Sequence, residues 1–171
     1  MTDSQRHIVL AEASAVLREI GSAGMRLHRL CDYLRQYVAA YDWVGFYLAV
    51  PGEGVLVLGP FSGAPTDHLR IPYGRGVCGQ AAAEDRTIVV PDVAQEANYL
   101  ACSVHVKSEI VVPVHYHGKL AGEIDIDSHT PDAFSEQDRL LLEELALECS
   151  ELVNEVAPGG WYPPGATGEP G

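Results

Sequence analysis

Two kinds of side chain in the middle of this sequence could do chemistry together, namely cysteine thiols and closely spaced carboxylates. The carboxylates are Glu109 and a run in which Glu123, Asp125 and Asp127 alternate with apolar residues. Alternate side chains of a strand point to opposite faces, so the run should line one face of a strand. Clustered carboxylates repel one another, so at least one should have a raised pKa and stay protonated near neutral pH. Such a group can donate a proton, and the remaining anions can hold a ligand ammonium group.

A solvated strand face is the alternative interpretation of the acidic run, and it stays open at this point. Glu109 begins a strand that a hairpin joins to the acidic strand, which adds a carboxylate and favours a clustered site. The acidic strand holds no histidine, and the chain has no Cys-x-x-Cys or zinc-finger spacing. We therefore expect no metal and no other cofactor, although acidic oxygens alone could hold Mg²⁺ or Ca²⁺.

The four cysteines fall into two groups. Cys31 and Cys149 lie on the apolar stripes of predicted helices and are interpreted as buried core residues. Cys78 and Cys102 lie beside small residues, in a loop or at a helix edge. Cys78 follows a glycine-rich turn at a predicted helix start, where the partial positive charge favours the thiolate. A redox pair and two incidental small residues are both compatible with this spacing.

Helices and strands must position these side chains, and periodicity predicts where they lie. Helices are expected over 4–20, 25–40 and 77–83 and after Ser135. Ile20 is expected on the apolar stripe of the first of these helices. Strands are expected over 42–50, 55–58, 68–71, 86–92, 109–114 and 120–127. Residues 59–67 are expected to form a loop. In the first strand Trp43 and Tyr47 flank Gly45 on one face, either as an aromatic pocket wall or as ordinary packing. The order of elements indicates an α+β fold, with one antiparallel sheet, helices on one face and long loops on the other.

Length and composition are those of a single globular domain, placed at residues 1–157 of the 171-residue chain. Glycine and proline dominate residues 158–171, which are predicted to be a flexible tail. The net charge of −13 argues against nucleic acids and anionic membranes as partners. The N-terminus has no signal pattern and no apolar run is long enough to span a bilayer, so a cytoplasmic location is expected.

Several motifs taken together resemble those of the free methionine-(R)-sulfoxide reductases, which are stand-alone GAF domains. The motifs are Trp43-x-Gly45-Phe46-Tyr47, Leu58-Gly59-Pro60-Phe61, Arg70-Ile71-Pro72-x-Gly74-Arg75-Gly76-Val77-Cys78-Gly79, Ala101-Cys102, Ser108-Glu109-Ile110-Val111-Val112-Pro113 and Asp125-Ile126-Asp127-Ser128. The resemblance covers about residues 17–153. It implies a six-stranded antiparallel GAF sheet, with the N- and C-terminal helices on one face and the ligand pocket on the other. It also implies reduction of free L-methionine-(R)-sulfoxide, regeneration by thioredoxin and a role in oxidative stress; the oligomeric state, a homodimer included, stays open.

Site residues follow from the same resemblance, motif by motif. Cys102 matches the cysteine usually assigned the attack on the sulfoxide sulfur, and Cys78 matches a second redox cysteine. The acidic substrate-binding residues of the family correspond to Glu109, Asp125 and Asp127. Its aromatic wall corresponds to Trp43 and Tyr47. Which cysteine attacks and which resolves the intermediate stays open.

Two positions depart from the family pattern. His68 stands where many members carry a third cysteine, which leaves Cys78 as the one partner for Cys102. Tyr99-Leu100-Ala101-Cys102-Ser103 replaces the more usual His-Ile-Ala-Cys-Asp and alters the polarity around Cys102. The alternative function is a non-catalytic GAF module that binds a small molecule and signals, because a fold alone proves no activity.

Overall fold

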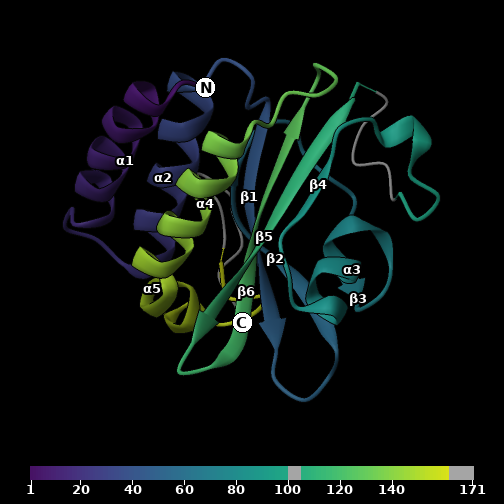
Figure 1. Ribbon diagram of the computed structural model, residues 1–171. Helices are drawn as coiled ribbons and strands as arrows, with labels where there is room; N and C mark the ends of the chain where they lie inside the picture. The colour runs from purple at the N-terminus through teal and green to yellow at the C-terminus, as the bar shows by residue number, and fades with distance from the viewer. Residues whose placement is uncertain (100–104, 162–171) are drawn as a thin grey trace.

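The computed structural model describes residues 1–99 and 105–161 (Figure 1). Its helices are α1 (Asp3–Leu17), α2 (Ala23–Tyr37), α3 (Gly76–Glu84), the 3₁₀ turn η1 (Val93–Gln95), α4 (Glu136–Glu148) and α5 (Ser150–Glu155). Its strands are β1 (Trp43–Val50), β2 (Val55–Ser62), β3 (Arg70–Pro72), β4 (Ile88–Val90), β5 (Ser108–Tyr116) and β6 (Lys119–Ser128). No helix in the described ranges combines the length and the apolar character needed to cross a membrane.

The strands form one six-stranded sheet in the order β3-β2-β1-β6-β5-β4, and all neighbouring strands are antiparallel. This arrangement confirms the predicted α+β fold. β1, β6 and β5 lie at the centre, and β6 is paired with β5 over Lys119–Ser128 and with β1 over Gly122–Asp127. Residues paired directly across the sheet point to the same face, so this register decides which side chains of the three strands meet.

The two faces of the sheet are covered differently. Figure 1 shows α1, α2, α4 and α5 on one side of the sheet and α3 on the other. The larger core lies under the four helices and includes Val44, Phe46 and Ile124 from the sheet. A smaller core under α3 includes Trp43, Tyr47 and Val111. The alternation expected for the first strand is therefore present, and the side with α3 is where a pocket can form.

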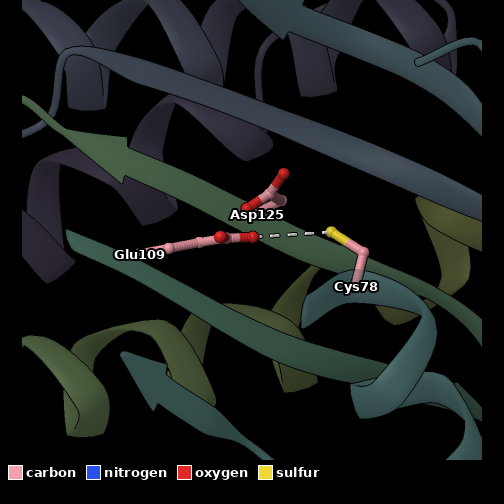
Figure 2. Close-up of side chains that lie close together, drawn as sticks. All are labelled: Cys78, Glu109 and Asp125. Carbon is pink, nitrogen blue, oxygen red and sulfur yellow. Dashed lines mark hydrogen bonds between the residues drawn. The ribbon is translucent and has the colours of Figure 1, made fainter. Parts of the chain in front are cut away.

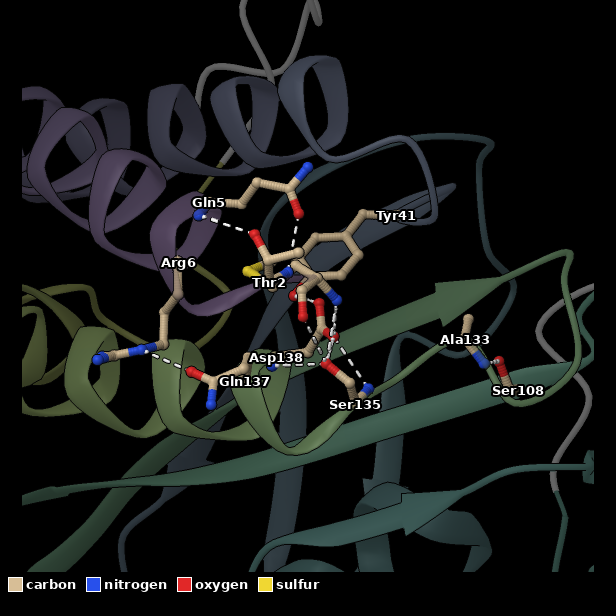
Figure 3. Close-up of polar contacts among 10 residues, drawn as sticks. Thr2, Gln5, Arg6, Tyr41, Ser108, Ala133, Ser135, Gln137 and Asp138 are labelled. Carbon is tan, nitrogen blue, oxygen red and sulfur yellow. Dashed lines mark hydrogen bonds and ion pairs between the residues drawn. The ribbon is translucent and has the colours of Figure 1, made fainter.

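A buried carboxylate, Asp138, joins the start of α4 to the start of α1 (Figure 3). Ser135 caps α4 and exchanges hydrogen bonds with Asp138 in a capping box, as Thr2 and Gln5 do at α1. Asp138 also accepts hydrogen bonds from the Tyr41 hydroxyl and the Met1 amino group, each at 3.0 Å. This network ties the start of α1 and the connection between α2 and β1 to the start of α4.

Several predicted boundaries are wrong, including the end of the second helix, which stops at Tyr37 rather than at residue 40. α1 ends at Leu17, whose carbonyl accepts hydrogen bonds from Arg26, so Ile20 is 96% exposed rather than on an apolar stripe. β2 continues through Pro60 to Ser62, where a loop was expected. Proline is tolerated there because β3 pairs only with Val55–Val57 and leaves this part of β2 at a sheet edge. The last helix is split at Cys149, where the backbone ψ of 2° departs from helical geometry.

The chain after α5 returns to the helical layer. Gly24 at the start of α2 leaves room for Trp161, because a Cβ atom there would lie 2.6 Å from the indole Cδ1. The indole also lies against His28 and edge-on to Phe61, with ring centroids 5.3 and 6.1 Å apart. Trp161 is therefore packed, whereas the rest of the predicted tail, 162–171, lies outside the described residues.

Candidate active site

A row of buried carboxyl groups occupies the face of β5 and β6 that α3 covers. Glu109 pairs with Asp127, and Glu123 and Asp125 follow on the same face of β6. Their exposed fractions are 3% for Glu109, 0% for Glu123 and Asp125, and 1% for Asp127. These values exclude the solvated-face interpretation. Burying four carboxyl groups is costly unless they are neutralised or bind something, which makes the row a candidate functional site.

The Cys78 thiol points at this row from α3 (Figure 2). Its Sγ donates to Glu109 Oε1 over 4.0 Å, and ligand atoms of Cys78, Glu109 and Asp125 all lie within 4.8 Å of one another. Cys78 is the third residue of α3, so the prediction that it lies near a helix N-terminus is confirmed. Three chemically active side chains from three elements therefore meet at one point.

Glycines bring α3 close enough for this contact. The Gly76 φ of +67° lets the chain turn into the helix, a conformation that other residues rarely adopt. A Cβ atom on Gly79 would lie 2.4 Å from the Pro72 carbonyl oxygen, so a side chain there would push α3 away. Asn98 holds the turn from outside, donating through Nδ2 to the carbonyls of Gly74 and Gly76.

Burial is the main electrostatic influence on the carboxyl row. It raises the pKa of Glu109, and the charges of Asp125 and Asp127 raise it further. It raises the pKa of Glu123 as well, with the charge of Asp125 as the second cause. For Asp125 burial raises the pKa to about 7, a rise that the nearby Cys78 thiol and Glu109 carboxyl moderate. The row can therefore keep a proton at neutral pH and give it to a bound ligand.

Aromatic rings border the carboxyl row on β1. Trp43 pairs with Asp127 and Tyr47 pairs with Glu123, so both rings lie on the face of the acids. The Trp43 indole stacks on Phe61 with centroids 5.5 Å apart, and its Nε1 donates to the Ala64 carbonyl at 3.0 Å. The Tyr47 hydroxyl donates to the His68 carbonyl at 3.0 Å. Both rings are thus held in fixed positions beside the carboxyl row.

Gly45 allows the Trp43 ring to pack closely against the backbone of β1. A Cβ atom on Gly45 would lie 2.3 Å from the indole Cη2 atom. Gly45 is paired with Asp125 across the sheet. The Trp43 ring therefore lies next to the residue that faces Asp125. The glycine between the two aromatic residues, visible in the sequence, is therefore required by the position of the Trp43 ring.

The predicted site residues and the two cysteines predicted as core separate into three groups. Cys78, Glu109, Asp125, Asp127, Trp43 and Tyr47 lie on the face that α3 covers. Cys102 lies outside the described residues. Cys31 and Cys149 are fully buried in the core on the opposite face, as predicted, and burial raises the pKa of both thiols.

Glu123 is the member of the row that the family motif did not include. Strand alternation already placed it on the acidic face, but the motif match named only its neighbours Asp125 and Asp127. In the structure neither Glu123 oxygen has a hydrogen-bond partner among the described residues, and the same is true of Asp125. Its complete burial, which the sequence pattern does not show, makes Glu123 part of the site.

Comparison with known proteins identifies the same fold and one particular family among the proteins that share it. The GAF domain family model matches residues 24–152. A free methionine-R-sulfoxide reductase of Saccharomyces cerevisiae is 43% identical over 116 residues, which cover 67% of this chain and 62% of that protein. Protein YtsP of Bacillus subtilis is 44% identical over 105 residues, which cover 61% of this chain and 64% of that protein. The chain thus spans less than two thirds of the length of these two relatives.

A solved structure provides a match over nearly the whole fold. The free methionine-R-sulfoxide reductase of Neisseria meningitidis, solved in complex with its substrate, superimposes with a TM-score of 0.83 and 36% identity. The match covers 91% of this chain and 93% of that one. The sheet order, the motif residues gathered under α3 and these matches agree. The chain therefore belongs to the GAF domain family and, within it, to the free methionine-R-sulfoxide reductases.

Proposed function

We propose that this protein reduces free L-methionine-(R)-sulfoxide to L-methionine with cysteine as the reductant at the active site. The observation that carries the proposal is the contact of a buried thiol, Cys78, with Glu109 beside Asp125, whose pKa is about 7. A thiol and a proton donor are what sulfoxide reduction needs. The enclosing aromatic wall and acid row supply the binding surface.

Substrate recognition follows from charge and shape. The substrate ammonium group is placed against the acid row, where it would stabilise the ionised form of the nearest carboxyl groups. The methyl and thioether end is placed against Trp43 and Tyr47, whose rings offer an apolar surface. Amides at the start of α3 are the proposed partners of the substrate carboxylate. A site of this kind selects a free amino acid, because a peptide bond would remove the ammonium charge.

The proposed chemistry is a two-electron transfer in three steps. Cys102, assigned from the family motif, attacks the sulfoxide sulfur while a carboxyl group of the row protonates the departing oxygen. The oxygen is transferred to that cysteine as a sulfenic acid, and methionine is released. The Cys78 thiol then condenses with the sulfenic acid, which forms a Cys78–Cys102 disulfide and releases water. A dithiol protein such as thioredoxin reduces the disulfide and is itself oxidised.

The assignment of Cys102 as the attacking thiol and Cys78 as the resolving thiol is part of the proposal. The catalytic cycle is proposed for the cytoplasm, where dithiol reductants are available. Because His68 stands in place of a third cysteine, Cys78 is proposed as the sole resolving thiol.

The test separates attack from resolution by single-turnover kinetics. Cys78→Ser should still form one methionine per enzyme, because the attacking thiol is intact. It should then stall with thioredoxin as reductant, since thioredoxin acts on disulfides, and recover partly with dithiothreitol, which attacks sulfenic acids directly. Cys102→Ser should form no methionine, and Cys149→Ser serves as the control with full turnover.

Two results would change the assignment. Loss of the single-turnover burst in Cys78→Ser would make Cys78 the attacking residue. Binding of methionine sulfoxide without any reduction by the wild-type protein would instead favour a GAF sensor that binds a small molecule.

A further inference from the structure

The donor atoms around Cys78 have the composition of a metal site as well as that of a redox site. The Cys78 thiol and the carboxylates of Glu109 and Asp125 each offer one ligand atom, and these atoms lie within 4.8 Å of one another. Figure 2 shows the three side chains converging from α3, β5 and β6. All three are buried, so an ion bound among them would be shielded from water.

A second observation indicates that the site is built for a positive charge. Glu123 is fully buried, and neither of its oxygens has a hydrogen-bond partner in the described part of the chain. It lies two residues from Asp125 on the same face of β6. Fully buried carboxyl oxygens without partners are rare because each one loses its hydration. A cation at the Cys78 cluster would supply the missing interaction.

The mixture of sulfur and oxygen donors limits which cation fits. Mg²⁺ and Ca²⁺ require six or more oxygen ligands, whereas Zn²⁺ takes four ligands and accepts both thiolate and carboxylate. Zinc distances imply sulfur–oxygen separations of about 3.6 Å in a tetrahedron. The distance from Cys78 Sγ to Glu109 Oε1 is 4.0 Å. A shift of a few tenths of an ångström would therefore bring the Cys78 thiol and the Glu109 carboxylate to the separation that a shared zinc ion requires.

We infer that the reduced protein binds a thiophilic divalent cation of the Zn²⁺ class through Cys78, Glu109 and Asp125, with Glu123 as the fourth ligand. Binding displaces the thiol proton and the carboxyl protons into solvent and changes no oxidation state. The ion is an inhibitor that shares the site and not a cofactor of the reaction. Ligation takes the Cys78 lone pair, and the ion repels the substrate ammonium group. The inhibition rests on the proposed function, whereas the binding does not.

Cobalt(II) is the probe, because it replaces zinc at tetrahedral sites and its thiolate complexes absorb in the near ultraviolet. Reduced, tag-free, full-length protein is titrated with Co²⁺ without oxygen. A thiolate-to-cobalt charge-transfer band should appear at one equivalent and disappear when Zn²⁺ is added. Cys78→Ser should lose the band, and Asp125→Asn and Glu123→Gln should each weaken cobalt binding at least tenfold. Cys149→Ser, whose thiol lies in the opposite core, should leave the titration unchanged.

Competition with an unreactive ligand tests the shared site. Free L-methionine carries the same ammonium group and cannot be reduced further by thiols, so it should raise the apparent dissociation constant for Co²⁺ in proportion to its concentration. A wild-type titration without the band would overturn the inference. A band that survives in Cys78→Ser and disappears in Cys102→Ser would overturn the ligand assignment. A dissociation constant for Co²⁺ that does not change with methionine concentration would overturn the claim that the ion and the substrate share a site.

The result of the cobalt-binding experiment does not depend on the result of the activity assay. A protein that binds Co²⁺ through Cys78 and never reduces methionine sulfoxide would contradict the proposed function alone. A protein that turns over normally and shows no cobalt band would contradict this inference alone.

Discussion

Asp125 should destabilise the folded protein at neutral and alkaline pH, and Asp125→Asn should relieve this. Burial raises the pKa of Asp125 from 3.8 to about 7. Between these values the unfolded chain has released a proton that the folded chain still binds, so stability falls as pH rises through this window. The rise in pKa corresponds to roughly 4 kcal/mol, fully expressed above pH 7.

The net effect of Asp125→Asn is smaller than this figure, because the amide is also buried. A buried amide without partners costs about 1–3 kcal/mol at every pH. The variant should therefore be more stable than the wild type by about 1–3 kcal/mol at pH 8. The difference should shrink toward acidic pH, because less of the proton-linked destabilisation of the wild type has developed there, and the two stability curves should meet or cross near pH 5.

Urea denaturation at half-unit intervals from pH 5 to pH 8.5 measures this difference. Asp67→Asn, an exposed position in the loop between β2 and β3, makes the same chemical change and should show no such pH-dependent gain. An Asp125→Asn variant that is no more stable than the wild type at pH 8, or a gain that is constant with pH, would refute the reasoning.

Two further substitutions test the packing on each face of the sheet. Cys149→Ser should lower the free energy of unfolding by about 1–3 kcal/mol, because it buries a hydroxyl in the core, and it should leave methionine production unchanged. Loss of turnover in that folded variant would contradict the structural role of Cys149. Gly45→Ala should cost about 1–3 kcal/mol in urea denaturation, because its Cβ would lie 2.3 Å from the Trp43 ring. Trp43→Phe in the same background should recover part of that loss, and unchanged stability of Gly45→Ala would show that the ring is not held against β1.

Local patterns in the sequence were sufficient to predict most elements of this fold. Alternation of apolar and acidic residues assigned Glu123, Asp125 and Asp127 to one face of β6, because side-chain direction in a strand depends only on position. The glycines before Cys78 indicated a sharp turn into a helix, because positive φ is accessible mainly to glycine. The apolar stripes separated Cys31 and Cys149 from the cysteines that could react.

Other features depend on partners that are distant in the sequence, and local patterns could not predict them. Ile20 continues the apolar stripe of α1, yet the helix ends at Leu17, where Arg26 binds its carbonyl. β2 extends to Ser62 because it pairs with β1 that far. Pro60 is tolerated within it because the other side of this part of β2 is a sheet edge.

The site itself was decided by the tertiary structure. The acidic face of β6 looks the same in the sequence whether it meets water or protein. It is buried because α3 packs over it, and this packing also brings Cys78 to Glu109. The raised pKa of Asp125 has the same cause, since desolvation depends on what covers a residue. The sequence determined which chemical groups share a face, and the packing of α3 determined that they form a buried, thiol-containing cluster whose carboxyl groups have raised pKa values.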